Sequence, residues 1–441
     1  MKNSLTRITA VLLAFALALA FAPSGETKRA YADVSVGEIT NVAFDENGIM
    51  TWDPVPDVSE YLLMIDGYEA EVLTETSFDI NSEIDMLIEY GQIENKGNHK
   101  IYIETNHIES MYSWIGTYKH FYQNKEVDTV FRYFGNSRYE TSLMVADAFK
   151  EKRGLEKLDS VIIAYGKNYA DALAGSCLSF NANAPIPLVD GNQSHITAMQ
   201  DYIKNNVTAG GTIYILGGTA IVPDSVKNGL SNYNFKRLWG PDRYETNLQI
   251  LAEASNIVPW FPDELIVCSG TGFADSLSAA ATGKPIMLVR GSSLTSGQAQ
   301  YLENLSKRKE LFIRVVGGTG VVSKNIFSQL KSYGTVYRIG GKDRYETSQL
   351  FADHYFNADV SAAVLAFGGN FPDGLCGGSL ANAMGAPLIL TANGKTSAAE
   401  NYVIGNGISY GAVLGGPTLI SDASAKAIFD VSPDSNVVTA Q

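Results

Sequence analysis

Apolar and polar positions alternate in blocks along most of the chain after residue 130. The first series has an apolar run at 160–165, a helical pattern over 171–179 and another apolar run at 185–189. Runs that are apolar almost throughout and are separated by helices are typical of parallel strands covered on both faces. This pattern predicts a small doubly wound α/β domain. The elements expected to complete it are a helix, a strand, a helix and a strand, at 196–204, 212–216, 223–230 and 235–239.

One signature divides this alternation into three tandem units. The pattern Arg-x-x-Gly-x-[Ser/Asp]-Arg-Tyr-Glu-Thr occupies residues 132–141, 237–246 and 338–347, at intervals of 105 and 101 residues. Solenoid and propeller repeats run about 20–50 residues, whereas independent domains run about 50–200. Each unit is therefore predicted to be a domain with its own core. The helices expected after each signature, which join one unit to the next, are 139–152, 244–254 and 345–356.

Residues 33–128 have a different pattern. Short alternating segments such as 61–65 and 100–104 are broken by turn residues, which predicts strands rather than helices. The stretch from Trp52 to Pro54, followed by Tyr61, resembles the opening of a fibronectin type III sandwich. The region is therefore predicted to be an all-β sandwich, with a helical turn over 82–90 that a plain sandwich does not have.

The start of the chain has the order of a secretory signal peptide. Lys2 and Arg7 precede an apolar run over 8–22, with small-residue cleavage options at 20–22 and 30–32. The run is shorter than the roughly 18–20 apolar residues that a membrane span needs, and no later run qualifies. Residues 1–32 are therefore predicted to be a cleaved signal peptide, and the mature protein to be secreted without a membrane span.

Charge is unevenly distributed along the chain. Residues 33–128 hold 20 acidic against 4 basic side chains, whereas residues 129–441 hold 26 against 25. Nucleic-acid binding needs a basic footprint, so the acidic first domain argues against that class of partner. The nearly neutral repeats can still hold an anion locally.

Within each signature, a Ser or Asp and a Glu three residues later have the spacing of a capping box. Capping leaves unexplained the arginine at the first helical position, where a positive charge opposes the helix dipole. A negative group is therefore expected beside it, either a carboxylate of a neighbouring module or an anionic ligand. The N-caps are Ser137, Asp242 and Asp343, and the arginines are Arg138, Arg243 and Arg344. Weaker candidates for the same contact are Arg132, Arg237 and Arg338.

A second acid recurs after the first strand of each unit, as Asp171, Asp275 and Asp373. Its place between a glycine-rich loop and an apolar helix predicts an N-cap. A catalytic carboxylate would need a partner acid, base or metal ligand at a matching position, and the sequence has none. A glycine pair also recurs at the carboxyl end of a predicted strand, where open α/β sheets usually bind ligands. A tight turn explains the pair equally well.

Cysteine and histidine usage argues against catalysis. The three cysteines are an odd number at unmatched offsets, which fits buried free thiols better than disulfides. Within the repeats only His195 and His354 occur, at non-equivalent places, and no metal-ligand spacing is present. No nucleophile elbow or phosphate-binding loop accompanies them. The sequence therefore predicts no catalytic residue, no metal and no cofactor.

Taken together, the triplicated signature, the aromatic-[Ala/Pro]-Asp-x-Leu loops, the proline-led strands and the glycine pairs resemble the cell wall binding repeat 2 family of Gram-positive surface proteins. The resemblance covers residues 130 to about 435. It implies three flavodoxin-like or Toprim-like α/β modules around a pseudo-threefold axis, over 129–235, 236–336 and 337–441. It also implies non-covalent attachment to an anionic, teichoic-acid-like secondary wall polymer.

In that family the polymer contact is associated with an Ile-Leu-Leu segment after the proline. The corresponding segments here, 186–188, 286–288 and 388–390, are not literal matches, and their pattern alone predicts buried core strands. The candidate polymer-binding residues are Arg138, Arg243, Arg344, Ile186, Leu188, Ile286, Met287, Leu288, Leu388, Ile389 and Leu390.

The favoured function is a secreted surface protein that is anchored in the cell wall by three modules and presents the β domain. An alternative is a non-catalytic modifier or partner of a wall hydrolase, because the same modules accompany amidases. A third class is an enzyme with its active site between modules, which muralytic activity of the purified chain would reveal.

Overall fold

The structure is a computed structural model that describes residues 37–45, 48–93, 98–105, 112–119, 130–258, 263–356, 360–429 and 437–439. The predicted signal peptide lies outside these residues. The chain divides into two compact units, and all three α/β modules belong to the second. None of the helices in the described part of the chain combines the length and the apolar character that crossing a membrane requires.

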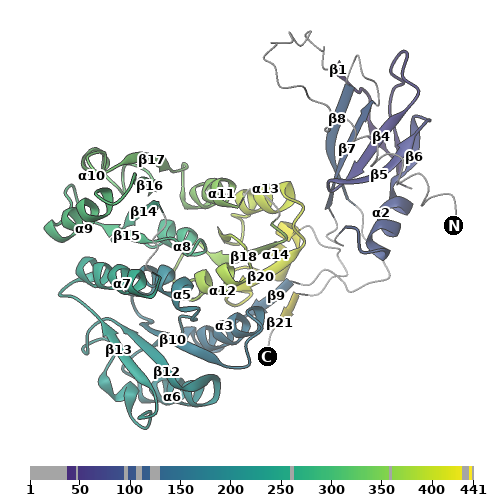
Figure 1. Cartoon of the computed structure of the whole chain (residues 1–441). Helices are drawn as coiled ribbons and strands as arrows, with labels where there is room; N and C mark the ends of the chain where they lie inside the picture. Colours follow the sequence, from purple (N-terminus) through teal and green to yellow (C-terminus); the bar gives the residue numbers. More distant parts are fainter. Residues whose placement is uncertain are drawn as a thin grey trace, which may run out of the picture. The chain divides into compact units, whose positions relative to one another are not determined.

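Among its described residues, the N-terminal region contains two sheets and one helix, and the larger sheet lies beside the helix in Figure 1. The larger sheet has the order β1 (Gly37–Glu38), β8 (Tyr112–Lys119), β7 (Asn98–Thr105), β4 (Tyr61–Ile65) and β5 (Tyr68–Leu73). The smaller sheet has the order β2 (Ala43–Phe44), β3 (Ile49–Thr51) and β6 (Ser77–Asp79). The expected helical turn is a full helix, α2 (Ile80–Glu89), which Asp79 caps by accepting a hydrogen bond from the amide of Ser82 at 3.1 Å.

Two aromatic residues from the sequence pattern lie in the core of this region. Trp52 and Tyr61 are both buried, and their rings meet edge to face with centroids 5.3 Å apart. The Tyr61 hydroxyl accepts a hydrogen bond from the amide of Val55 at 2.9 Å. The extended segment after Trp52 is thereby fixed against β4.

Each module contains one parallel sheet, as the apolar runs predict. Module 1 has the order β11 (Leu188–Val189), β10 (Leu158–Tyr165), β12 (Val207–Leu216) and β13 (Asn234–Leu238). Module 2 has the order β15 (Ile286–Val289), β14 (Glu264–Ser269), β16 (Phe312–Val316) and β17 (Thr335–Ile339). Module 3 has the order β19 (Leu388–Thr391), β18 (Ala362–Phe367), β20 (Tyr410–Leu414), β9 (Val130–Tyr133) and β21 (Val437–Thr439).

The last of these sheets joins the two ends of the repeat region. Strand β9 lies at the start of module 1 in sequence, yet in the structure it lies between β20 and β21 of module 3, where Val130 faces Gly411 on one side and Val437 on the other. In modules 1 and 2 the corresponding position belongs to β13 and β17, the strands that enter the next signature. Every signature strand therefore completes the sheet of the module before it in a closed cycle.

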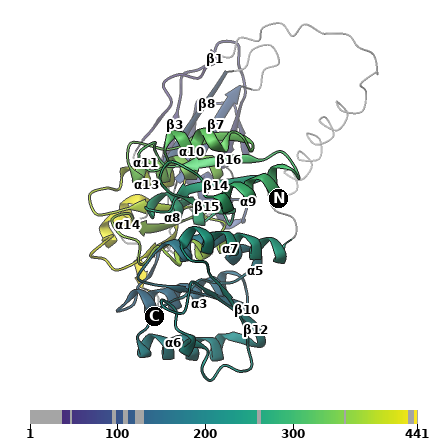
Figure 2. The ribbon, with the colours of Figure 1, turned by 90° about the vertical axis from the view of Figure 1, so that its left-hand side faces the viewer.

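The signature helices also connect neighbouring modules. Helix α7 (Arg243–Ile257) contacts both α5 (Ser176–Ala182) of module 1 and β15 of module 2, and it lies between the two sheets in Figures 1 and 2. Helix α11 (Arg344–Tyr355) contacts α8 (Ala274–Ala280) and β19 in the same way. Helix α3 (Arg138–Lys152) closes the cycle by contacting β11 and α12 (Gly377–Ala383) of module 3.

The two faces of the module 1 sheet have different neighbours. In β10, Val161 and Ile163 belong to a core that is confined to module 1, together with Phe149 of α3 and Ile203 of α6 (Gln193–Asn206). The alternate residue Ile162 belongs to a core that extends through all three modules. The outer face of this sheet is thus closed mainly within module 1, whereas its inner face is buried only by the assembly of the three modules.

Two predicted helices differ from the structure. The helix expected over 171–179 is divided into α4 (Ala170–Ala174) and α5 at Gly175, where a Cβ would lie 2.8 Å from the Leu216 side chain, so that glycine is required at the break. The helix expected over 223–230 is a short 3-10 turn, η1 (Asp224–Lys227), although its counterparts α10 (Lys324–Leu330) and α14 (Asp422–Phe429) are helical. The three cysteines are buried free thiols, as predicted.

Candidate functional site at the module junctions

The predicted N-caps of the signature helices are confirmed. The Ser137 hydroxyl accepts a hydrogen bond from the amide of Glu140. Asp242 and Asp343 each accept two hydrogen bonds, from the amides of the signature tyrosine and glutamate of their own helix. The reciprocal half of the capping box is displaced by one residue, because Glu140 accepts from the amide of Asn136, which precedes the cap. These contacts make the signature a rigid entry to each helix.

The threonine and the first glycine of the signature are explained by the same turn. The amide of Gly135 donates to the Thr141 hydroxyl at 3.0 Å, and a Cβ on Gly135 would lie 2.4 Å from the Cβ of Glu140. The other two modules repeat this arrangement at Gly240 and Gly341. Glycine is therefore required where the helix folds back over the end of the strand.

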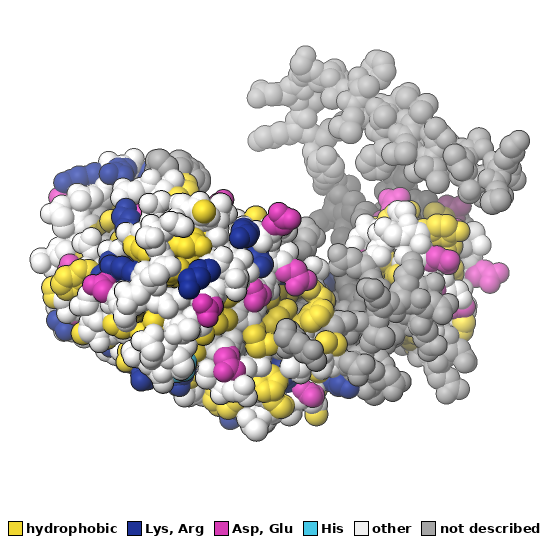
Figure 3. Space-filling view, turned by 90° about the horizontal axis from the view of Figure 1, so that it is seen from below, with side chains coloured by type: hydrophobic (Ala, Val, Ile, Leu, Met, Phe, Trp, Pro, Cys, Tyr) yellow, Lys and Arg dark blue, Asp and Glu magenta, His cyan; other side chains and the backbone are white. Residues whose placement is uncertain are grey.

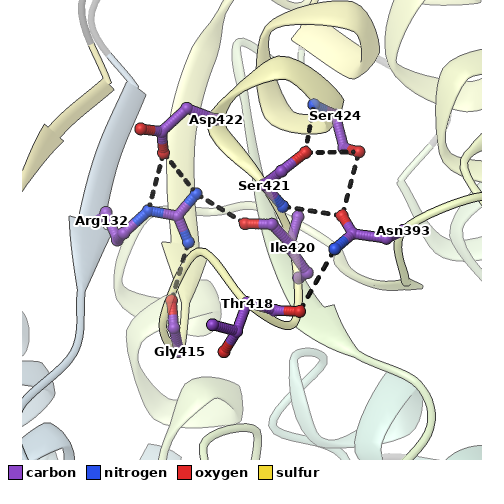
Figure 4. Close-up of polar contacts among 8 residues, drawn as sticks. All are labelled: Arg132, Asn393, Gly415, Thr418, Ile420, Ser421, Asp422 and Ser424. Carbon is purple, nitrogen blue, oxygen red and sulfur yellow. Dashed lines mark hydrogen bonds and ion pairs between the residues drawn. The ribbon is translucent and has the colours of Figure 1, made fainter.

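The first arginine of each signature clamps a glycine-pair loop. The buried Arg132 donates to the carbonyls of Gly415 at 2.7 Å and Ile420 at 2.8 Å, and it forms a salt bridge with Asp422 (Figure 4). Burial lowers the pKa of Arg132 from its usual value, an effect that Asp422 partly offsets. The equivalent loop contacts are those of Arg237 with Gly217 and Val222, and of Arg338 with Gly317 and Val322. These loop clamps hold the carboxyl ends of the sheets in place.

The second arginine of each signature lies at the junction with the preceding module. Arg243 donates through Nη1 to the Gly270 carbonyl at 2.6 Å, and its guanidinium lies 5.4 Å from the ring centroid of Tyr169 in module 1. Such a cation beside an aromatic face gains about 0.5–2 kcal/mol. The matching sets are Arg344 with Gly368 and Phe273, and Arg138 with Gly166 and Phe371.

The aromatic residues of the three junctions meet one another. The ring centroids of Tyr169, Phe273 and Phe371 are separated by 6.1, 5.5 and 5.8 Å, so each ring touches the other two. The sequence shows an aromatic residue two positions before each repeated aspartate, but its contact role was not predicted. Mutual contact of three equivalent residues brings the three junctions to a common centre.

The prediction that the repeated aspartates are N-caps is wrong. The structure gives no side-chain cap bond at these helices, whose N-caps are Tyr169, Phe273 and Cys376. Asp171 instead lies within the first turn of α4, with its carboxylate against Gly217. Gly217 has a φ of +97° and no room for a Cβ, which explains the first residue of the glycine pair.

Each aspartate faces the signature arginine of the next module. Burial raises the pKa of Asp171 to about 6, and the charge of Arg243 partly opposes this shift. Burial likewise raises the pKa of Asp275 and of Asp373, opposed by Arg344 and by Arg138. No salt bridge joins these pairs within the described residues, so each junction contains a cation and a nearby carboxyl group that are attracted but not in contact.

The aliphatic candidates lie in the core. All eight side chains are at most 2% exposed, so in this conformation they pack within and below the sheets, and their contact with a polymer stays a prediction. They are Ile186, Leu188, Ile286, Met287, Leu288, Leu388, Ile389 and Leu390. Sequence reasoning also passed over Trp239, which is 56% exposed at the end of β13 beside Gly218. Its position directly before the signature glycine is the sequence feature that could have drawn attention to it.

No group of three or more His, Cys, Asp or Glu side chains in the described part of the chain is arranged to hold a metal ion. The junctions therefore offer arginines, aspartates and aromatic rings as their chemistry. Guanidinium groups of this kind bind anions by charge and by hydrogen bonding.

Comparisons with known proteins agree with the triplication. The Cell wall binding domain 2 family matches at residues 132–227, 237–327 and 338–425. In Bacillus subtilis (strain 168), the N-acetylmuramoyl-L-alanine amidase LytC is 26% identical over 288 residues and the amidase enhancer is 27% identical over 285. Both alignments cover 63% of this chain, but 53% of the amidase and 37% of the enhancer. The chain thus spans about half of one relative and about a third of the other.

Two solved structures from Clostridium difficile share the fold. Cwp8 has a TM-score of 0.58 and 22% identity, covering 84% of this chain and 63% of its own. Cwp6 has a TM-score of 0.59 and 17% identity, covering 88% and 66%. With three family matches on three parallel-sheet modules, the chain belongs to the cell wall binding domain 2 family and is a cell wall binding protein.

Proposed function

We propose that this protein is a secreted surface protein whose three modules grip an anionic wall polymer at the junction arginines. The observation that carries the proposal is a guanidinium held in the same way three times, at Arg138, Arg243 and Arg344. Arg138 and Arg243 are half-buried and Arg344 is exposed, so none is sealed from solvent. An identical site presented three times suits a ligand that itself repeats.

The hydrogen bonds of these arginines leave donors for a ligand. Within the described residues, all of them come from Nη1, which leaves Nε and Nη2 to donate. A planar guanidinium fork matches phosphate and carboxylate groups, and each charge-assisted bond contributes about 1.5–3 kcal/mol. The loop clamps differ, because Arg132 already uses all three of its nitrogens.

Three modest sites together give firm attachment. Linking sites on one protein raises avidity by about 10²–10⁴ without any new contact. On the face in Figure 3, lysine and arginine side chains are dispersed among acidic and apolar ones, so attraction by a broad basic surface is not the basis of the proposal. Binding is expected to weaken with salt, because partly exposed charges are screened.

The test is retention of the whole chain on purified wall material, before and after the polymer is extracted. The variant carries Arg138→Gln, Arg243→Gln and Arg344→Gln, and retention is expected to fall at least tenfold, since about 1.4 kcal/mol already corresponds to that factor. The matched control removes three exposed cations outside the junctions, with Lys307→Gln, Lys324→Gln and Lys331→Gln. Equal retention of the two variants, or retention that survives polymer extraction, would refute the proposal.

We infer that the N-terminal region is a fibronectin type III-like domain that the modules present at the surface. Its three-stranded and five-stranded sheets and the buried Trp52–Tyr61 pair support this assignment, and α2 is its departure from a plain sandwich. Wall retention should be unchanged when residues 33–128 are removed. A loss of retention would assign wall contact to this region as well.

A second function is a non-catalytic partner of a wall hydrolase. The similarity to an amidase and to an amidase enhancer favours it. Adding the purified chain to an amidase digestion of cell walls should change the rate if this function is correct. An unchanged rate, with wall binding intact, would leave anchoring as the function.

A further inference from the structure

Module 1 contains a buried carboxylate directly after β11, and the residues at this position in the other two modules are not acidic. Asp190, the residue after β11, is 2% exposed and accepts hydrogen bonds from the Tyr139 hydroxyl at 3.0 Å and the Asn192 amide at 2.9 Å. It also pairs with Lys167 at 2.9 Å and with Nδ1 of His195 at 2.7 Å. Burial raises the pKa of Asp190, but the bonds from His195 and Lys167 outweigh burial and hold it well below its usual range. The residues that follow β15 and β19 are Arg290 and Ala392.

This carboxylate fixes the orientation of His195. Because Nδ1 faces the acceptor Asp190, an imidazole with a single proton carries that proton on Nδ1, and its Nε2 is then a hydrogen-bond acceptor. The ring is also stacked on Tyr139, with centroids 3.9 Å apart and planes inclined by 28°. His195 is therefore held rigidly, with one acceptor atom directed away from the cluster.

A cavity of about 150 Å³ lies beside this histidine. Its apolar lining comes from Leu143, Leu188 and Met199, and its polar lining includes Glu140, Ser194 and His195. A cavity of about this volume holds a group of roughly six heavy atoms, such as benzene. A short substituent fits within it, and the rest of a larger ligand lies outside.

The polar lining consists of acceptors. Glu140 uses Oε2 to accept from Asn136, which leaves Oε1 without a hydrogen bond among the described residues. The Ser194 hydroxyl donates to the side chain of Asn192, so only its lone pairs are left for a ligand. Together with Nε2 of His195, three acceptors border a small apolar space.

Module 2 fills the corresponding space. A Cβ on Gly297, in the first turn of α9 (Ser296–Ser306), would lie 3.0 Å from both Glu245 and Leu248, the counterparts of Glu140 and Leu143. Helix α6 begins four residues after the end of β11, whereas α9 begins seven after the end of β15. The cavity and its histidine are therefore products of the early start of α6 in module 1.

We propose that this cavity binds a primary ammonium group carried on a short aliphatic body. An ammonium has three donors and no acceptor, which matches Glu140, Ser194 and His195, while the aliphatic part packs on Leu143, Leu188 and Met199. Two chemical sources present such a group, an aminoacyl ester and an unacetylated amino sugar. This inference rests on the proposed function, because the cavity would bind a cationic substituent of the same wall ligand.

The experiment titrates the whole chain with alanine methyl ester and with glucosamine, followed by saturation-transfer NMR. N-acetylalanine methyl ester and N-acetylglucosamine serve as the amine-blocked probes, and they should bind at least tenfold more weakly. Stronger binding of the ester assigns the site to aminoacyl groups, and stronger binding of glucosamine assigns it to amino sugars. Equal binding of free and blocked amines would overturn the proposal.

Two variants locate the binding. Glu140→Gln should weaken binding of the ammonium probe about tenfold, as expected for loss of a charged hydrogen bond. The matched Glu245→Gln of module 2 should leave this binding unchanged. Ala198→Phe adds a ring at an exposed position on the cavity wall and should abolish binding without touching Glu140. Equal effects of Glu140→Gln and Glu245→Gln would refute the site. These probes do not test wall retention, so failure here leaves the junction proposal standing.

Discussion

The loop clamps and the module junctions use the same residue type, six positions apart in one signature, for different purposes. At the clamp, Arg132 is 1% exposed and uses three nitrogens on two carbonyls and a carboxylate. At the junction, Arg138 is half-buried and donates through one nitrogen, beside an aromatic ring and a carboxyl group that it does not touch. The clamp arginine and the arginine proposed to bind a ligand thus differ in the number of hydrogen-bond donors left over, which residue identity does not reveal.

The largest loss of stability is expected from a substitution at the clamp. Arg132→Ala removes the guanidinium that donates to the Gly415 and Ile420 carbonyls, and each buried acceptor left without its donor costs about 1–3 kcal/mol, so the two together cost about 2–6 kcal/mol. We expect a loss of this size in the free energy of unfolding, measured by denaturant titration. Arg138→Ala should cost much less, because its guanidinium is partly solvated. Equal losses would contradict the division into clamp and junction.

Strand β9 supplies the next largest effect. Phe131→Pro places a proline in an inner strand of the module 3 sheet, where it removes a ladder hydrogen bond and leaves a buried carbonyl without its donor, at a cost of about 1–3 kcal/mol. Val438→Pro is the control, because Val438 faces Phe131 from the edge strand β21. Hydrogen exchange at β20 should accelerate in the first variant and stay near normal in the second. Unchanged exchange in both would mean that β9 does not support module 3.

The sequence predicted local features better than pairings between modules. The spacing of the signature identified the three modules, and local residue patterns identified the parallel strands and the N-caps of the signature helices. The place of β9 was missed, because its partner Gly411 is about 280 residues away and periodicity does not say which sheet a strand joins. Asp171 was misread as a cap, because the helix begins one residue earlier, at Ala170, and the carboxylate is positioned by Gly217.

The junction carboxyl groups predict a dependence of stability on pH. The pKa of Asp171 is raised from 3.8 to about 6, so between these values the folded protein keeps a proton that the unfolded chain has released. The contribution of Asp171 to stability is therefore full below pH 3.8 and is lost as pH rises through about 6. Asp171→Asn should flatten this decline, and denaturant midpoints at pH 4.5 and 7 measure it. If the stability of the variant depends on pH in the same way, burial does not raise the pKa of Asp171, and the prediction is wrong.

The smallest effect is expected at the exposed partner of a clamp. Arg237 contacts Asp224 at 3.0 Å in addition to two loop carbonyls, but the Asp224 side chain is 58% exposed, and exposed pairs contribute about 0–1 kcal/mol. Module 2 makes the same point, because Arg338 keeps both carbonyl bonds where Lys324 replaces the acid. Asp224→Ala should therefore change the free energy of unfolding by less than about 1 kcal/mol, measured beside Arg132→Ala. A loss of several kcal/mol would show that the carboxylate, and not the carbonyl pair, holds the arginine in the clamp.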